Sequence, residues 1–171
     1  MRDFSKYIRN IPDFPKPGIH FKDITPLLSD PEVFREAIQA MAAPFKDRGV
    51  QYIASVDARG FIFGGAMAYM MNAGFVPIRK KGKLPYKTYE VSYDLEYGSN
   101  VLTIHQDAFP RGSKVLICDD VLATGGTALA TAQLVEKLGG EVVGITFLAE
   151  LTDLRGREKL RGYEVYSLIA F

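Results

Sequence analysis

Apolar residues recur at helical spacing between Val33 and Phe45. Just before this pattern, Asp30 offers a capping side chain, Pro31 suits the first helical position and Glu32 places an acid in the first turn. The pattern predicts an amphipathic helix that continues to Phe45 and packs one face on a core.

The next segments alternate between strand and helix patterns. Apolar runs predict strands at residues 52–56 and 75–78, and the stretch between them predicts a helix over about residues 61–72. Strand, helix and strand in this order form the crossover of a parallel sheet. Residues 60–78 carry no charge, but the run is interrupted near Gly74 and falls short of the roughly 20 apolar residues of a membrane-spanning helix. A buried helix and strand are expected instead.

Strict alternation of apolar and polar residues begins at Tyr89. It continues over residues 89–97, residues 98–100 have the composition of a turn, and residues 101–105 form a second strand pattern. These features predict a β-hairpin, which we expect to project from the sheet rather than lie inside it. The remaining patterns predict a strand at residues 115–118, a helix at 128–138, and strands at 141–151 and 163–170.

Length and charge narrow the class of protein. The 171 residues suit one domain, so the order of elements predicts a single α/β domain with a parallel core, an antiparallel flap and an N-terminal segment outside the repeating pattern. With 21 basic and 20 acidic residues the net charge is +1, which argues against a dedicated nucleic-acid binder. Residues 1–10 are charged and lack the apolar centre of a secretory signal.

The single cysteine and the two histidines limit the redox and metal chemistry. Cys118 lies in an apolar run and has no partner for an intrachain disulfide, which fits a reducing compartment. His20 and His105 are far apart and belong to no zinc motif. We therefore expect a cytoplasmic protein, and any metal to be a hard ion on oxygen ligands.

The most informative segment is VLICDDVLATGGT, residues 115–127. An apolar strand ends in two acids, and a glycine-rich loop then opens directly into a helix. Backbone N–H groups and the helix dipole can hold a phosphate there without the lysine of a Walker A loop. Acids beside a phosphate suit ribose hydroxyls or a magnesium ion carried by the ligand. The expected sugar 5-phosphate site consists of Asp119, Asp120, Ala123, Thr124, Gly125, Gly126 and Thr127.

This segment resembles the phosphoribosyl-diphosphate (PRPP) motif of the type I phosphoribosyltransferase family. PDFPKPGIHFKDITPLL, DARGFIFG, RKKGKLP, YDLEYG and LTDLRGREKL are similar to the branch of the family that acts on adenine, so the resemblance covers almost the whole chain. It implies a central, mostly parallel sheet flanked by helices, a flexible antiparallel flap at about residues 81–105 and a small hood at about residues 1–30, all in one domain over residues 1–171. It also implies a homodimer that uses magnesium and converts adenine and PRPP into AMP and diphosphate in purine salvage.

The resemblance assigns further residues to the diphosphate. The turn at residues 57–59 matches the family's diphosphate loop, with Ala58 in the place of a common serine. Cations follow at the next strand end, where open α/β sheets bind ligands, and His105 at the far end of the hairpin is a further candidate. The residues expected at the diphosphate are Asp57, Ala58, Arg59, Arg79, Lys83 and His105.

The resemblance also implies the residues that act on the base. Glu96 matches the catalytic glutamate of the family, which acts through N7 of adenine while N9 attacks, and Tyr97 follows it on a flap that excludes water. His20 replaces a common apolar residue and Lys22 a common arginine, changes that recognition by the main chain tolerates. The residues expected at adenine are His20, Phe21, Lys22 and Leu151.

Two other functions remain open at this point. The chain could be a phosphoribosyltransferase of the same fold that acts on xanthine, hypoxanthine or orotate, or a regulator that senses PRPP and binds DNA or RNA. LEYG and GREKL favour adenine, and the net charge of +1 leaves little basis for a nucleic-acid surface. We therefore expect no nucleic acid and no membrane among the partners.

Overall fold

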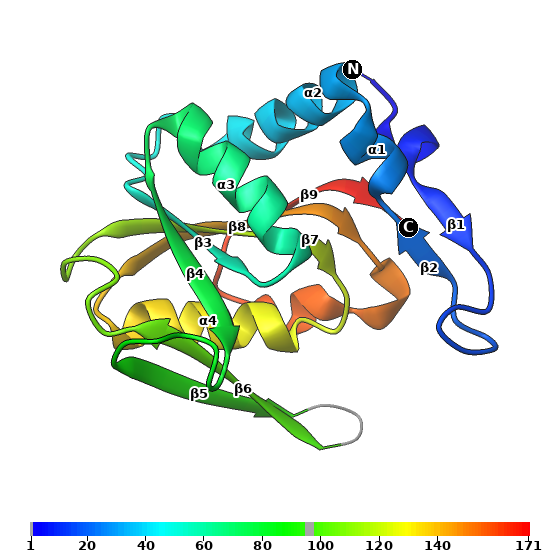
Figure 1. Cartoon of the computed structure of the whole chain (residues 1–171). Helices are drawn as coiled ribbons and strands as arrows, with labels where there is room; N and C mark the ends of the chain where they lie inside the picture. Colours follow the sequence, from blue (N-terminus) through cyan, green and yellow to red (C-terminus); the bar gives the residue numbers. More distant parts are fainter. Residues whose placement is uncertain (1, 95–97) are drawn as a thin grey trace.

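A seven-stranded sheet forms the centre of the computed structural model, which describes residues 2–94 and 98–171. The strand order is β5-β6-β4-β3-β7-β8-β9 (Figure 1). Strands β4, β3, β7, β8 and β9 are parallel to one another, and the antiparallel hairpin β5–β6 joins β4 at one edge. The strands are β3 (Tyr52–Val56), β4 (Gly74–Lys80), β5 (Thr88–Asp94), β6 (Ser99–His105), β7 (Lys114–Leu122), β8 (Glu141–Glu150) and β9 (Val165–Ala170). The expected α/β class with a mostly parallel sheet is confirmed.

Helices cover both faces of this sheet. They are α2 (Pro31–Ala42) and α3 (Arg59–Met71) on one face and α4 (Gly126–Lys137) on the other (Figure 1). In β7, Leu116 and Cys118 belong to the core under α2 and α3, whereas Val115 and Ile117 belong to the core under α4. Successive side chains of a strand point to opposite faces, so a strand covered on both sides needs an unbroken apolar run. In the described part of the chain no helix has the length and apolar character to span a bilayer.

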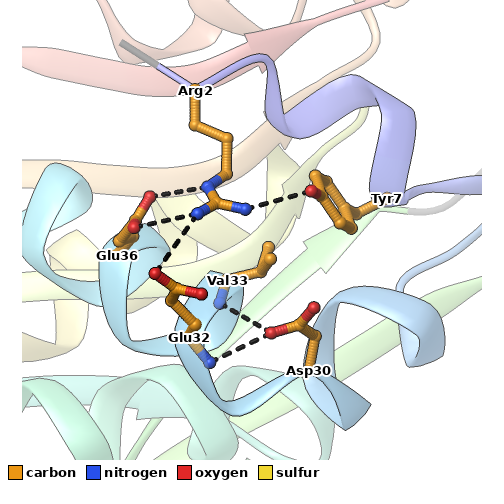
Figure 2. A network of polar contacts seen from close by, with 6 residues as sticks. All are labelled: Arg2, Tyr7, Asp30, Glu32, Val33 and Glu36. Carbon is orange, nitrogen blue, oxygen red and sulfur yellow. Dashed lines mark hydrogen bonds and ion pairs between the residues drawn. The ribbon is translucent and has the colours of Figure 1, made fainter.

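Helix α2 begins where the capping pattern predicted. The Asp30 carboxylate accepts hydrogen bonds from the N–H groups of Glu32 and Val33 at 3.0 and 3.1 Å (Figure 2). These amides have no partner within the helix, so the cap stabilises its first turn. The expected helix is one turn too long, because Pro44 lacks the N–H that an α-helix needs and the chain forms a 3-10 turn, η2 (Ala43–Phe45), instead.

Several strands run further than their apolar patterns. β7 continues through Asp119 to Leu122 and stays paired with β8, with Asp119 opposite Phe147 and Leu122 opposite Glu150. The expectation that the strand ends at the two acids is therefore wrong. The ladder is made by backbone groups, whereas an apolar pattern marks only the part of a strand that is buried on both faces.

The β5–β6 hairpin continues the sheet instead of projecting from it. Arg79 and Lys80 of β4 pair with Thr103 and Leu102 of β6, and Leu102 and Ile104 are buried in the core under α4. Alternation identifies the apolar face of a hairpin but not the element that covers it, and here the cover is α4 of the same chain.

An N-terminal unit lies beside β9 (Figure 1). It consists of η1 (Phe4–Tyr7), the antiparallel strands β1 (Arg9–Ile11) and β2 (Phe21–Asp23), and α1 (Thr25–Ser29). Figure 2 shows how Arg2 fastens this unit to α2. Its guanidinium donates to both carboxylate oxygens of Glu36 at 2.7 and 3.1 Å and to the Tyr7 hydroxyl at 3.0 Å. Arg2 thereby joins the start of the chain and η1 to α2.

Candidate active site

The loop between β7 and α4 forms a small cup. A cavity of about 100 Å³ is lined by Asp119, residues 121–128 and Phe147. Gly125 precedes α4 with a φ of 85°, a conformation that favours glycine, and no described side chain caps the first turn of the helix. The N–H groups of that turn can therefore bind an anion, which the helix dipole also favours. The five loop residues predicted for a 5-phosphate, Ala123, Thr124, Gly125, Gly126 and Thr127, all line this cavity.

A larger cavity of about 270 Å³ adjoins the cup, because Asp119 and Thr127 line both. It lies at the carboxyl ends of β3, β4 and β7, where open α/β sheets bind ligands. Six of the predicted site residues line it, namely Asp57, Ala58, Arg59, Asp119, Asp120 and Thr127. A ligand with its phosphate in the cup has room for a second anionic group in the larger cavity.

The two acids of β7 are held in different surroundings. Asp119 accepts a hydrogen bond from the N–H of Asp120 at 2.9 Å and faces the first turn of α3, where a Cβ on Gly60 would lie 2.6 Å from its Oδ1. Burial, and after it the charge of Asp120, raises the pKa of Asp119 well above its usual range. A side chain at position 60 would therefore have to displace the Asp119 carboxylate. A cation or hydrogen-bond donor near this buried carboxyl would stabilise its charged form.

Asp120 is matched by a cation of the diphosphate turn. Its side chain is only 9% exposed, and its Oδ2 lies 2.6 Å from Nε of Arg59. Among the described residues this oxygen has no well-aligned hydrogen bond, so the pair is held by charge more than by directed bonding. The Arg59 guanidinium also lies 5.3 Å from the centre of the Phe21 ring. Arg59 therefore connects an acid predicted for ribose with a residue predicted for adenine.

A second ion pair links two other residues predicted for the diphosphate. Nε of Arg79 lies 2.9 Å from Oδ2 of Asp57, and another guanidinium nitrogen donates to the backbone oxygen of Lys83 at 3.0 Å. Lys80, the neighbour of Arg79, lines the larger cavity, whereas Arg79 and Lys83 do not. Adjacent strand residues point to opposite faces, so Lys80 and Arg79 point in different directions at the end of β4. Roles for Arg79 and Lys83 at the diphosphate stay predictions.

His105 lies apart from both cavities. β6 runs antiparallel to β4, so His105 lies beyond Thr103, the partner of Arg79, and away from the carboxyl edge of the sheet. Its ring packs edge-on against Tyr86 with 6.2 Å between ring centres. A role for His105 at the diphosphate stays a prediction.

The residues predicted for adenine lie on two segments. Phe21 and Lys22 belong to β2, beside Arg59, and the Lys22 ammonium lies 4.2 Å from the centre of the Phe171 ring. His20 is exposed, with its Nδ1 3.4 Å from the side-chain nitrogen of Asn10. The N–H of Leu151 donates to the carbonyl of Leu122 at 2.9 Å, directly before the phosphate loop. Leu151 thus lies next to the cup, and its contact with a base stays a prediction.

The hairpin contributes residues that sequence reasoning left undecided or missed. Tyr93 and Asn100 line the larger cavity, and the Tyr93 hydroxyl accepts hydrogen bonds from Thr127 at 3.2 Å and from Asn100 at 3.4 Å. The alternating pattern placed Tyr93 on the apolar face but could not indicate its contact with the phosphate loop. The predicted catalytic residue Glu96 and flap residue Tyr97 lie outside the described residues.

A metal site made of protein groups alone is absent from residues 2–94 and 98–171. No group of three or more histidine, cysteine, aspartate or glutamate side chains there could hold an ion. Asp119 lines both cavities, and Asp120 lines the larger one. They supply the hard oxygen atoms that magnesium prefers, and the ligand would have to supply the rest.

Comparison with known proteins agrees with this geometry. Residues 24–169 match the family described as "Phosphoribosyl transferase domain". Adenine phosphoribosyltransferase of Symbiobacterium thermophilum is 56% identical over 169 residues, which cover 99% of both chains. The crystal structure of adenine phosphoribosyltransferase from Rhodothermus marinus matches with a TM-score of 0.93 and 53% identity, covering 97% of this chain and 95% of that one.

A more distant structure contains ligands. Adenine phosphoribosyltransferase of Saccharomyces cerevisiae, complexed with adenine and D-2,5-dideoxy-2,5-imino-altritol 1,6-bisphosphate, matches with a TM-score of 0.90 and 39% identity over 95% of this chain and 94% of that one.

Proposed function

Because the chain belongs to the phosphoribosyl transferase family, we infer that it transfers the 5-phosphoribosyl group of PRPP to adenine and forms AMP and diphosphate. The relatives carry this activity in their names, and the yeast protein binds adenine together with a sugar-like bisphosphate. The protein is therefore a glycosyltransferase of purine salvage. Neither another base nor a PRPP-sensing role is favoured by these comparisons.

One observation supports the placement of PRPP above all others: the phosphate cup and the larger polar cavity share Asp119 and Thr127. PRPP carries a monophosphate at one end of its ribose and a diphosphate at the other. We assign the monophosphate to the cup, the ribose to the junction and the diphosphate to the larger cavity. The carboxylates of Asp119 and Asp120 then face the ribose hydroxyls, which can donate hydrogen bonds to them.

The reaction breaks the bond from the anomeric carbon to the diphosphate and forms a bond to N9 of adenine. Positive charge develops on the ribose as the diphosphate leaves, and the acids of β7 lie where they stabilise it. Arg59, Lys80 and the turn at residues 57–59 line the cavity assigned to the departing diphosphate. Arg59 must exchange its carboxylate partner for the diphosphate when PRPP binds.

Adenine is assigned to the side of Arg59 that carries Phe21, with Leu151 as a further proposed contact. Phe21 already contacts the guanidinium of Arg59, a residue of the larger cavity, so an aromatic ring lies next to a cation of the site. Adenine that carries its proton on N7 attacks through the lone pair of N9, and the matched glutamate, Glu96, is the proposed base that accepts the N7 proton as the N9 bond forms. Its place beside the base is part of the proposal.

Magnesium is proposed to enter with PRPP. The oxygen donors of Asp119 and Asp120 fit a hard ion that keeps phosphate oxygens as further ligands. Bound there, the ion would neutralise part of the diphosphate charge as the leaving group departs. Asp119 would then be deprotonated, since a nearby cation offsets the burial that raises its pKa.

One assay tests the function. Purified protein is incubated with PRPP, magnesium and one base at a time from adenine, hypoxanthine, xanthine and orotate, and nucleotide formation is followed by chromatography. AMP formation with adenine at more than about a hundred times the rate of the other bases is expected. PRPP binding without any nucleotide product would identify a sensor instead.

A homodimer is also proposed, on the evidence of α3. Apolar side chains cover one side of this helix and the start of β4, with Ile62 41% exposed, Tyr69 92%, Met70 42% and Phe75 38%. The opposite side of α3 is buried in the core, so the helix is apolar all round, as expected of a helix covered on both sides. A second copy of the chain is the proposed cover. Tyr69→Glu should convert a dimer to a monomer in sedimentation velocity, and a wild-type monomer would contradict the proposal.

A cytoplasmic location is proposed because the only cysteine, Cys118, is buried and unpaired by disulfide, which suits a reducing compartment. Fractionation of cells followed by the PRPP-dependent assay tests it. Activity outside the cytoplasmic fraction would contradict it.

A further inference from the structure

The segment that contains GREKL touches the phosphate loop with its backbone. Gly156 begins the 3-10 helix η4 (Gly156–Leu160), and a Cβ at this position would overlap the carbonyl oxygen of Ala123 and lie 2.8 Å from Cδ1 of Leu122. The contact is reciprocal, because a Cβ on Gly125 would lie 2.5 Å from the carbonyl oxygen of Gly156. Two glycines therefore let the loop and η4 pack backbone to backbone.

The neighbouring arginine anchors η4 to the sheet. Nε of Arg157 lies 2.9 and 2.8 Å from the two carboxylate oxygens of Glu150, whose side chain is 8% exposed. The same guanidinium donates to the backbone oxygen of Val165 at 2.8 Å and to the Ser167 hydroxyl at 3.3 Å. Arg157 is thus fixed by the end of β8 and by β9 at once.

Only a short stretch of backbone separates the Arg157–Glu150 ion pair from the phosphate loop. Glu150 is followed by Leu151, whose N–H donates to Leu122, the last residue of β7 before the loop. At the other end of η4, Leu160 is 1% exposed and belongs to the core under α4. η4 is therefore held at both ends and lies against residues 123–125.

We propose that Gly156 and Arg157 are positioning residues that hold the 5-phosphate loop in its binding shape and join it to Leu151, an inference that rests on the proposed function. A glycine-rich loop is intrinsically free to change its φ and ψ angles, and a phosphate is bound well only when several N–H groups already converge on it. A rigid backbone support on one side of the loop supplies that preorganisation.

Gly156→Ala probes the contact itself. Gly156 does not have a positive φ, so alanine adds a clash with Ala123 but no intrinsic backbone strain. The loop must move, and we expect the Kd of AMP in titration calorimetry to rise at least tenfold. The Kd of diphosphate, assigned to the other cavity, should stay within about twofold of the wild type.

Arg157→Lys probes the anchor without adding bulk. Lysine keeps the charge but cannot bind the two oxygens of Glu150 and the β9 groups together. We expect the KM of PRPP to rise about three- to tenfold with a smaller change in kcat. The matched control is Arg48→Lys, since Arg48 also pairs with a glutamate, Glu164, at 2.7 Å but neither residue lines the two cavities. Its KM should equal that of the wild type.

The possible results of these experiments lead to different conclusions about the positioning role and the proposed function. If the wild type binds AMP and both variants bind it equally well, the positioning role is overturned. If Gly156→Ala fails to fold, the KM of PRPP for Arg157→Lys decides alone, and a value equal to that of Arg48→Lys overturns the proposal. If the wild type binds neither AMP nor PRPP, the proposed function itself fails.

Discussion

Oδ2 of Asp120 lies 2.6 Å from Nε of Arg59, so an acid assigned to ribose and a cation assigned to diphosphate neutralise each other in the wall of the larger cavity. Asp57 and Arg79 repeat this arrangement at 2.9 Å. An uncompensated buried charge is costly, and Arg59 offsets that cost for the buried Asp120 before PRPP arrives, whereas Asp57 and Arg79 are partly exposed. The ribose hydroxyls of PRPP can donate hydrogen bonds to the carboxylate, and its diphosphate oxygens can accept them from the guanidinium. Bound PRPP can therefore replace each residue of a pair as the partner of the other.

The first prediction concerns the ion pair of Arg59 with Asp120. Arg59→Met should lower kcat/KM for PRPP by about a hundred- to a thousandfold, because the leaving diphosphate loses a cation. It should also lower stability, since Asp120 stays buried without a partner. Arg59→Met combined with Asp120→Asn should recover part of that stability in urea unfolding. A double variant as unstable as the sum of the two single changes would show that the pair is not coupled.

The second prediction concerns Tyr93. Tyr93→Phe keeps the ring that packs near Gly126 but removes the hydroxyl that accepts from Thr127, a hydrogen bond worth about 1 kcal/mol. We expect the KM of PRPP to rise about three- to fivefold, because Thr127 loses its orientation in the cup, with kcat changed less than twofold. Steady-state kinetics with PRPP varied at saturating adenine measures both constants.

Tyr89→Phe is the matched control for Tyr93→Phe, because Tyr89 lies on the same hairpin face but lines neither cavity. Equal KM values for the two variants would remove Tyr93 from the site and leave it a packing residue.

The phosphate cup could be predicted from the sequence because its parts are contiguous. Residues 119–127 contain the acids, the loop and the start of α4, so local chemistry was sufficient. The pairs Arg59 with Asp120 and Thr127 with Tyr93 join segments that are distant in the chain. Such contacts depend on strand order and register, which hydrophobic periodicity does not determine.

The choice between Arg79 and Lys80 illustrates the same limit. Both residues end β4, and composition alone treats them as equal cations. Only the orientation of the strand decides that Lys80 faces the larger cavity while Arg79 turns to Asp57. The contact of Gly156 with the phosphate loop could not be predicted from the sequence either, because a close approach of two backbones leaves no pattern of side chains.

The third prediction concerns Glu96, which the family resemblance assigns to catalysis. If its carboxyl moves a proton on adenine, Glu96→Gln should lower kcat by about a hundred- to ten-thousandfold, the range for general acid–base groups, and leave PRPP affinity nearly unchanged. kcat and kcat/KM for adenine should fall together. Glu90→Gln is the control, since Glu90 lies on β5 and pairs with Lys81 at 3.0 Å. Activity of Glu96→Gln within threefold of this control would exclude the role.

The last prediction concerns Asp119, whose negative charge should favour PRPP binding but lower the stability of the folded protein. Burial and the charge of Asp120 raise its pKa well above the usual range. An acid with a higher pKa in the folded chain binds more protons when folded, so its contribution to stability falls as pH rises from the unfolded value of about 3.9 toward the folded value. Asparagine has no such charge to bury and still accepts from the N–H of Asp120.

Asp119→Asn should therefore melt above the wild type at pH 7.5, by roughly 2–4 °C for each kcal/mol of penalty removed in a chain of this size. The gap should shrink toward pH 4, where Asp119 is protonated in both the folded and, increasingly, the unfolded chain. The same variant should bind PRPP at least tenfold more weakly in calorimetry, because a neutral amide cannot balance the developing ribose charge or a magnesium ion.

Asp153→Asn, at an exposed acid of the turn η3 (Thr152–Leu154), is the control and should alter neither property. A melting temperature of Asp119→Asn that equals the control at every pH would show that Asp119 is charged without penalty in the folded protein, and unchanged PRPP affinity would remove it from the ribose site.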